Sequence, residues 1–253
     1  MSKRILMIAG VVCALALSWL AAPTPALAQD ATHYTFVSFW AVPRAQWNDF
    51  EKAGADTAAI LEKMVADGTV VSWGMGSSLV HTEDGYTHST WFTSDTQAGI
   101  LKTLDALQNA SRTPQLAAAT KHRDYFQHTL AHGGKTARAN SGYVRVAAWQ
   151  AKPGRGEDVE AFFKKYIQPD LDAAVADGSV LMYNFDTETI HTDAPGGYVL
   201  AVAYANGDGL DKAAAALARH AKEDPAAGEG FGAMLENKEH RDELFRLTGF
   251  QHK

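Results

Sequence analysis

The chain has 253 residues, a formal net charge of −6 at pH 7 and a single cysteine. Because this mildly acidic chain has no run of Lys or Arg, its charge pattern argues against a protein that binds nucleic acid or an anionic membrane surface. With one cysteine, an internal disulfide is excluded.

The N-terminus has the pattern of a secretory signal peptide. MSKR is positively charged, an apolar segment follows, and residues 23–28 read PTPALA. This order predicts a signal peptide over residues 1–28 that is cleaved after Ala28. An uncleaved membrane anchor is the alternative, because the apolar run approaches the length of a membrane span.

Removing the leader changes what the chain can do. Lys3, Arg4 and Cys13 leave with it, so the mature chain has a charge of −8 and no cysteine. Thiol nucleophiles and cysteine metal sites are therefore excluded. We expect a bacterial periplasmic or secreted protein, with no stable membrane insertion after cleavage.

The mature chain repeats itself. Residues 65–82 (VADGTVVSWGMGSSLVHT) and 175–192 (VADGSVLMYNFDTETIHT) are identical at seven of eighteen positions, where chance gives about one. KHRD at residues 121–124 is likewise followed by EHRD at residues 239–242. The spacing predicts a tandem duplication.

Each copy shows the same succession of patterns. An alternating β-rich run comes first, then an amphipathic helix ended by Asp-Gly, a strand leading into a hairpin, a second helix and a short last strand. In the first copy the first strand covers residues 34–42, the first helix 44–66, the hairpin turn 81–86, the second helix about 97–109 and the last strand 124–131. In the second copy the first strand covers residues 143–151, the first helix 156–176, the hairpin turn 191–198, the second helix about 210–220 and the last strand 242–249.

The order predicts an α+β fold of two tandem ferredoxin-like βαββαβ repeats. We place the repeats at residues 29–134 and 135–253, with a linker at about residues 133–141. One face of each sheet packs on its own helices, so the other face needs a cover, and the second copy can supply it.

A short motif points to a family. AKPG at residues 151–154, followed by GEDVEAFF at residues 156–163, resembles the strand–turn–helix connection of the dimeric α/β-barrel superfamily. That group includes antibiotic-biosynthesis-type monooxygenases and stress-responsive barrel proteins. The first copy has Pro43-Arg44-Ala45 instead of the Pro-Gly turn.

The resemblance implies that two sheets pair into a barrel within one chain, as a monomeric pseudo-dimer or a higher oligomer. It implies a small-molecule partner and, if the protein is an enzyme, a cofactor-independent monooxygenase-like activity. We predict no cofactor. Haem stays open because some relatives bind it, and the histidines that could serve as its ligand are His81, His88, His191 and His240.

The repeated segment differs in its middle, and the difference falls on alternate positions. The first copy has Ser72, Gly74, Gly76 and Ser78, where the second has Met182, Asn184, Asp186 and Glu188. Alternation places each set on one sheet face. We expect this face to look into the barrel, with the Gly-Ser side leaving volume and the polar side anchoring a ligand. The predicted ligand-binding residues are Ser72, Gly74, Gly76, Asn184, Asp186, Glu188 and Arg145.

Three residues are candidates for catalysis: Arg145, Asp186 and His88. Arg145 lies on an alternating position of the neighbouring strand, where it could pair with Asp186 or Glu188 or meet an anionic ligand. A plain salt bridge is the alternative. For His88, hairpin pairing favours a buried core histidine over a base, because it shares a face with Trp73.

The duplicated HRD tripeptide (His122-Arg123-Asp124 in the first copy) has two interpretations. A His beside an Asp is suited to acid–base work, but a feature retained in both copies more often fixes the architecture. Two histidines also lie four apart, His128 and His132, yet no third ligand has defined spacing. We predict no metal site.

Three hypotheses for function follow. The first is a barrel that binds a small, partly apolar molecule between the two repeat sheets. The second is a cofactor-independent monooxygenase-like enzyme, and the third is a structural or interaction module whose barrel is filled by its own side chains.

Overall fold

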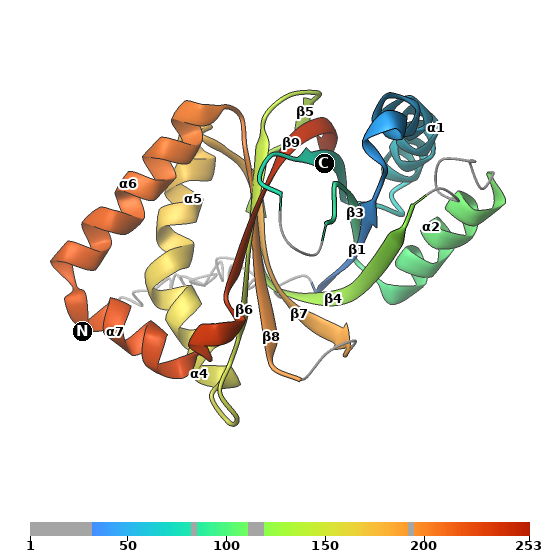
Figure 1. Cartoon of the computed structure of the whole chain (residues 1–253). Coiled ribbons are helices and arrows are strands. Elements are labelled where there is room, and N and C mark those ends of the chain that lie inside the picture. The colour runs from blue at the N-terminus through green and yellow to red at the C-terminus, as the bar shows by residue number, and fades with distance from the viewer. Residues whose placement is uncertain (1–31, 82–84, 111–118, 192–194) are drawn as a thin grey trace, which may run out of the picture. The chain divides into compact units, whose positions relative to one another are not determined.

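The computed structural model describes residues 32–81, 85–110, 119–191 and 195–253 (Figure 1). The predicted signal peptide lies outside these residues. Within the described ranges, no helix combines the length and apolar character needed to cross a membrane.

Eight strands close into an antiparallel barrel. Their order around the barrel is β2-β3-β1-β4-β7-β8-β6-β9, and β9 pairs back onto β2. A short strand, β5 (Ala137–Ala139), pairs with the end of β9. The barrel strands are β1 (His33–Ala41), β2 (Ser72–Ser78), β3 (His88–Ser94), β4 (Lys121–Gly134), β6 (Tyr143–Gln150), β7 (Val180–Ile190), β8 (Gly197–Tyr204) and β9 (Arg241–His252).

Helices cover the barrel on two opposite sides. Two α-helices pack against the strands of residues 33–134, and the remaining helices cover the strands of residues 143–252 (Figure 1). The first group is η1 (Arg44–Gln46), α1 (Trp47–Ala66) and α2 (Gln97–Asn109). The second is α4 (Gly156–Phe162), the π-helical segment η2 (Phe163–Ile167), α5 (Gln168–Asp177), α6 (Gly207–Glu223), α7 (Pro225–Met234) and η3 (Asn237–Glu239).

The predicted helix ends are confirmed. α1 ends at Ala66 and α5 at Asp177, and the glycines that follow, Gly68 and Gly178, have φ of 79° and 83°. Only glycine adopts this left-handed conformation without steric cost. Each glycine therefore stops its helix and turns the chain into the next strand.

Two helical features differ from the sequence-based expectation. The single helix expected over residues 156–176 contains the π-helical turn η2, and α7 was not expected at all. α7 reads PAAGEGFGAM, and three glycines in ten residues give it a low intrinsic helix propensity. It forms because Phe231 and Met234 pack on the second-half core.

The barrel has three separate apolar cores. Trp73 and Phe92 pack beneath α1 and α2, and Tyr183 and Phe185 pack beneath α4–α6. The third core is inside the barrel and includes Phe39, Phe245 and Phe250. Trp73, Tyr183 and Phe185 thus face the helices as predicted, whereas Leu181, expected on the same face, packs against the inner core beside an irregularity in the β7–β8 pairing.

Candidate functional site

The barrel interior holds a cavity of about 470 Å³. Its walls come from both halves of the chain and are mainly apolar and aromatic, as in most small-molecule sites. The main apolar lining residues are Val37, Phe39, Tyr86, Trp91, Tyr125, Val144, Val146, Met182, Val199, Ala201, Ala203 and Phe245. Arg123, Glu188, Arg241 and Glu243 add charged groups to the lining.

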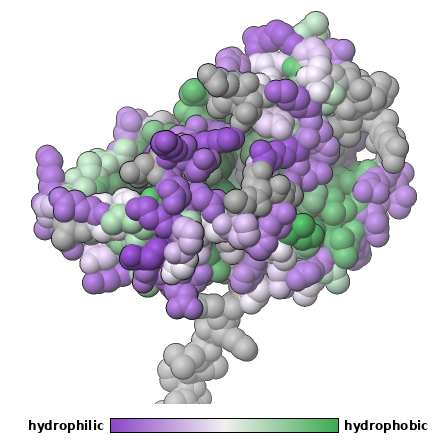
Figure 2. Space-filling model, turned by 60° about the horizontal axis from the view of Figure 1, so that its bottom comes forward, coloured by the Kyte–Doolittle hydropathy of each residue, from purple (hydrophilic) through white to green (hydrophobic). Residues whose placement is uncertain are grey.

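These charged residues lie at one end of the barrel: Glu188 is close to the end of β7, and Arg123, Arg241 and Glu243 are close to the starts of β4 and β9. This end of the barrel, where β7 ends, is at the bottom of Figure 1. Figure 2 turns this end toward the viewer and shows hydrophobic surface set among hydrophilic residues.

Asp186 is the buried carboxyl group of the cavity wall. It extends from β7, is 1 % exposed, and its Oδ1 makes no hydrogen bond to another described residue. Burial raises the pKa of Asp186 to about 7, while a hydrogen bond with Thr129 opposes that rise. A carboxyl group poised near neutrality in an apolar cavity can both take up and release a proton.

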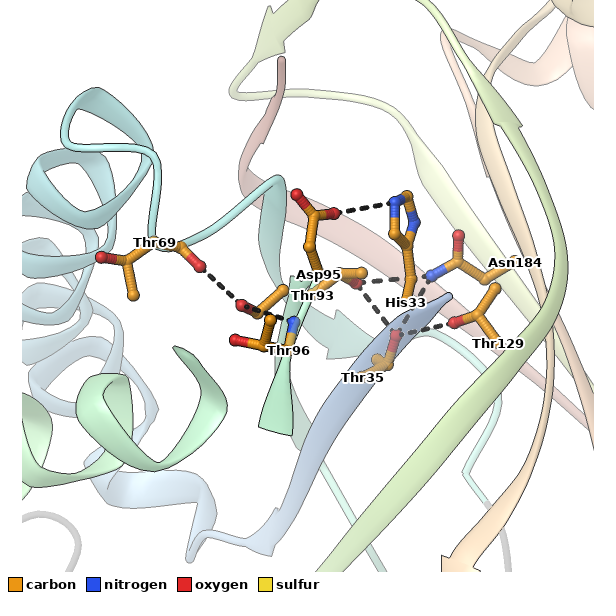
Figure 3. Close-up of polar contacts among 9 residues, drawn as sticks. His33, Thr35, Thr69, Thr93, Asp95, Thr96, Thr129 and Asn184 are labelled. Atoms are coloured by element: carbon orange, nitrogen blue, oxygen red, sulfur yellow. Dashed lines mark hydrogen bonds and ion pairs between the residues drawn. The ribbon is translucent and has the colours of Figure 1, made fainter. Parts of the chain in front are cut away.

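Asp186 lies opposite Thr129 in the pairing of β7 with β4, and Thr129 belongs to a buried polar layer that Figure 3 shows. The Thr35 hydroxyl is 3.0 Å from that of Thr93 and 3.5 Å from that of Thr129. Asn184 donates from Nδ2 to Thr35 at 3.3 Å and to Thr93 at 3.4 Å. The layer connects strands β1, β3, β4 and β7 through side chains.

Three histidines gather at the end of the barrel opposite the β7–β8 connection. The rings of His33 and His132 have centroids 4.0 Å apart, and His33 Nε2 is 3.0 Å from Oδ1 of the exposed Asp95. Burial, His132 and His33 lower the pKa of His252 to about 4. Burial and His132 also lower the pKa of His33, and Asp95 partly offsets this.

No pattern in the sequence indicates this histidine cluster. His33, His132 and His252 come from three strands that are far apart in the chain, so only the strand register brings them together. Within the described parts of the chain, no group of three or more His, Cys, Asp or Glu residues is arranged to hold a metal ion.

The predicted Gly-Ser wall faces inward, but the expected open volume beside it is wrong. A Cβ built on Gly74 would overlap the indole ring of Trp91, and one on Gly76 would come within 2.9 Å of the Arg246 carbonyl. The missing side chains on β2 therefore make room for Trp91 and for a close approach of β9. Ser72 is 1 % exposed and lies opposite Thr93 and His252.

Asn184, Asp186 and Glu188 line the cavity, but Arg145 lies elsewhere. Its guanidinium group pairs with Asp242, with Nη2 3.0 Å from Oδ1, on the outer face of β6. The expected pairing of Arg145 with Asp186 or Glu188 is therefore wrong. Val144 and Val146, its neighbours in sequence, face the cavity. The alternation along β6 therefore places the even-numbered residues inward here, and Arg145 outward.

His88 also lies outside the cavity. It is 3 % exposed, and it packs against the rings of Trp47 and Phe50 beneath α1. Its Nδ1 is 2.9 Å from the Thr87 hydroxyl, and burial lowers its pKa to about 4. This environment keeps the imidazole neutral and fits the core-histidine interpretation.

The two copies of the HRD tripeptide form matching clusters on the outer face. His122 stacks on Trp40 and His240 on Trp149, with ring centroids 5.3 and 5.4 Å apart. Each histidine Nε2 also contacts an aspartate, Asp124 at 2.9 Å in one cluster and Asp242 at 3.2 Å in the other. We call these the Trp-His-Asp clusters.

A haem group does not fit the candidate histidines. The large cavity is lined by none of His81, His88, His191 or His240, and the same holds for a second cavity of about 220 Å³ beneath α5 and α6. His88 is enclosed by aromatic rings, and His240 Nδ1 is already bonded to the Ala148 carbonyl at 3.0 Å.

Comparison with known proteins gives matches at the level of structure. No protein-family model and no curated protein sequence matches the chain. A putative monooxygenase from Lactobacillus acidophilus NCFM superposes with a TM-score of 0.66 at 12 % identity, covering 87 % of this chain and 96 % of that one. A putative monooxygenase from Fusobacterium nucleatum gives 0.67 at 10 % identity, covering 88 % and 95 %.

An anthrone oxidase-like protein is more distant, with a TM-score of 0.52 at 11 % identity over 88 % of this chain and 94 % of that chain. At such identities the likeness concerns the fold. The chain has the dimeric α/β-barrel fold that the motif at residues 151–163 predicted.

Proposed function

We propose that the barrel binds a small, largely apolar molecule in its cavity, and that Asp186 exchanges a proton or a hydrogen bond with a polar group of that molecule. The observation that carries the proposal is the buried Asp186 carboxyl, whose Oδ1 has no partner among the described residues in a cavity of about 470 Å³. Because a buried carboxyl oxygen without a hydrogen bond lowers stability, a role in binding or catalysis is the best reason for keeping it.

Binding is tested first with the neutral fluorescent dye N-phenyl-1-naphthylamine. We expect saturable fluorescence enhancement with the wild-type protein and at least tenfold weaker binding by Ala201→Phe, which fills the cavity. Ala216→Phe, the same change in the smaller outer cavity, is the matched control and should bind as wild type. Equal binding by Ala201→Phe would place the dye elsewhere and contradict the proposal.

The role of Asp186 is tested with 1-naphthol and its methyl ether. At pH 8 the ionised carboxylate accepts a hydrogen bond from the naphthol hydroxyl, so we expect about tenfold tighter binding of naphthol, or about 1.4 kcal/mol. The preference should vanish in Asp186→Leu. An unchanged preference would remove Asp186 from the site.

Oxygenation of the bound molecule is the second candidate activity. The similarity to putative monooxygenases over 87–88 % of the chain favours it, and Asp186 supplies the base that an electron-rich phenol needs before its anion can react with O₂. The test is oxygen uptake with a panel of phenols, compared between wild type and Asp186→Asn. A barrel filled by its own side chains is disfavoured by the cavity volume.

We also propose that the two halves arose by duplication. Asp67 and Asp177 each accept a hydrogen bond from a backbone N–H two residues on, at 3.0 and 2.8 Å. Each also pairs with a lysine of the second helix, Lys102 or Lys212. These equivalent contacts and the equivalent strand order of the halves support one ancestral βαββαβ unit and a monomeric pseudo-dimer.

Export to the periplasm remains our proposal for location. It rests on the leader pattern of residues 1–28. Mass spectrometry of the protein from an exporting host should find a mature N-terminus at Gln29.

A further inference from the structure

Six polar residues follow one another around the inside of the barrel on six neighbouring strands. Asp186 lies opposite Thr129 in the pairing of β7 with β4. Thr35 lies opposite Thr93 in the pairing of β1 with β3. Ser72 of β2 lies opposite Thr93 on one side and His252 of β9 on the other. We call Asp186, Thr129, Thr35, Thr93, Ser72 and His252 the hydroxyl belt.

Hydrogen bonds join the belt from Asp186 to Thr93, and the strand register continues it through Ser72 to His252. Thr35 bridges Thr129 at 3.5 Å and Thr93 at 3.0 Å, and Figure 3 shows this central part. Residues directly opposite each other in an antiparallel pair have Cβ atoms about 4.5–5.5 Å apart, so the other side chains are also within reach of one another.

The belt joins two different environments. Its hydroxyl residues are each no more than 5 % exposed. Asp186 opens it in the cavity wall, and the half-buried His252 closes it beside the histidine cluster at the far end of the barrel. It therefore follows the inside of the barrel wall from the ligand cavity to the histidine cluster.

Each member can pass a proton on. A hydroxyl group both donates and accepts a hydrogen bond, and a neutral imidazole accepts at one nitrogen. Asp186 Oδ1, Ser72 Oγ and His252 Nδ1 make no hydrogen bond to another described residue. These atoms have no competing contact, and proton transfer through Ser72 requires its hydroxyl to rotate toward Thr93 and His252, because neither bond is formed in this structure.

We propose that the hydroxyl belt transfers protons between Asp186 in the cavity and the histidine cluster at the opposite end of the barrel. This proposal rests on the proposed function, in which Asp186 takes a proton from the bound molecule. The belt would carry that proton away from Asp186 while the molecule still fills the cavity.

The transfer conserves every proton. The Asp186 carboxylic acid gives its proton to the Thr129 hydroxyl oxygen, whose own proton moves to Thr35, and the shift continues through Thr93 and Ser72. His252 Nδ1 accepts the last proton, and Asp186 is left as a carboxylate. His252, as the weaker base by about three pKa units, holds the proton about a thousandfold less well than Asp186. It therefore does not store the proton, and the neutral ring is restored when the imidazolium releases a proton at the histidine cluster.

The experiment follows the protonation of Asp186 by infrared spectroscopy after a rapid pH jump from 8.5 to 5.5. The carbonyl band of its acid form is assigned by its loss in Asp186→Asn. Water in the cavity offers a shorter route, so the measurements use a Val199→Phe background. Val199 lies opposite Asp186 and lines the cavity, so Phe covers the carboxyl there without any ligand. Ala201→Phe is the second background if the first does not fold.

Three changes at threonines are compared in that background. Thr93→Val removes a belt hydroxyl, and we expect at least tenfold slower protonation with an unchanged band midpoint. Thr93→Ser keeps the hydroxyl and should keep the rate. Thr103→Val is the matched control, because Thr103 is a fully buried threonine on α2 whose hydroxyl bonds to its own helix at Gly99.

Two results would overturn the proposal. One is equal rates for Thr93→Val and its parent. The other is equal slowing by Thr93→Ser, or a moved midpoint, which would assign Thr93 a structural or electrostatic role. The infrared experiment uses no ligand, so the two proposals fail separately. Failure of the wild-type protein to bind the dye would count against the proposed function alone. An unchanged rate of Asp186 protonation in Thr93→Val would count against the belt alone.

Discussion

The two halves of the barrel agree on their outer faces and differ on their inner ones. Outside, the Trp-His-Asp clusters repeat almost without change, with interplanar angles of 5° and 9°. Inside, Gly74 lies beneath Trp91 in one half, whereas Asn184 faces Ala201 in the other. On the outer face, both halves keep the same residues in the same contacts. On the inner face, the larger residue of a cross-strand pair lies on the second strand in one half and on the first strand in the other.

The fit between Gly74 and Trp91 can be disrupted by one substitution and partly restored by a second. Gly74→Asn forces a side chain into the Trp91 ring, so we expect a loss of about 3 kcal/mol or more in the free energy of unfolding. Adding Trp91→Ala copies the Asn184–Ala201 pair into the first half and should restore part of that loss. Urea unfolding of both single variants and the double variant gives the coupling energy.

If the losses of unfolding free energy in Gly74→Asn and Trp91→Ala simply add in the double variant, residues 74 and 91 are not coupled, and the comparison with Asn184 and Ala201 is wrong. Gly54→Asn on α1 is a control for glycine replacement, because only the flexible Met75 side chain lies near its Cβ position.

Asp186 replaces Gly76 of the first half, and its burial should have a measurable cost. A folded-state pKa of about 7 lies above the unfolded value, so the stability this group contributes is present below about pH 4 and is lost as pH rises toward 7. Asp186→Asn should therefore raise stability by about 2 kcal/mol at pH 8 and have little effect at pH 4. Thermal unfolding at both pH values checks this, and an equal effect at both would contradict the buried charge.

The histidine cluster should act in the opposite direction. His252 has a pKa lowered to about 4, so its contribution to stability is present above the unfolded value and lost as pH falls from about 6.5 to 4. His252→Asn should lessen that acid-induced loss by about 2 kcal/mol. His81→Asn, at an exposed position, is the control. Identical pH profiles for wild type and His252→Asn would argue against the cluster.

The smallest effects are expected on the matching outer faces. His122→Ala and His240→Ala each remove a half-exposed ring from a Trp-His-Asp cluster, and each should cost about 0.5 kcal/mol or less. The two losses should agree within error, and dye binding should not change. A large difference between them, measured by urea unfolding, would show that one cluster has acquired a role of its own.

Much of the fold was predictable because it depends on local signals. The apolar periodicity, the Asp-Gly helix ends and the repeated segment gave the order of elements and the inward face of β2 and β7. The site was less predictable, since its partners meet only through strand register. Asp186, Asn184 and Glu188 were found by alternation, but Trp91, the threonine layer and the histidine cluster were not.

Arg145 shows why alternation fails at particular positions. Which face a residue takes depends on where the strand starts, and a shift of one position exchanges the two faces. The β-bulge between Thr129 and Ala131 has the same effect within β4, because it brings His132 back to the interior. Such irregularities leave no clear pattern in a single sequence.

The closure of the barrel also bears on fragment complementation. β4 pairs with β7 and β2 with β9, so each seam joins one half of the chain to the other. Residues 32–134 alone would leave β2 and β4 as unpaired edges, and residues 135–253 would leave β7 and β9. Two separately made fragments therefore carry complementary edges along both seams, and their reassembly would report on cavity formation without any label inside the barrel.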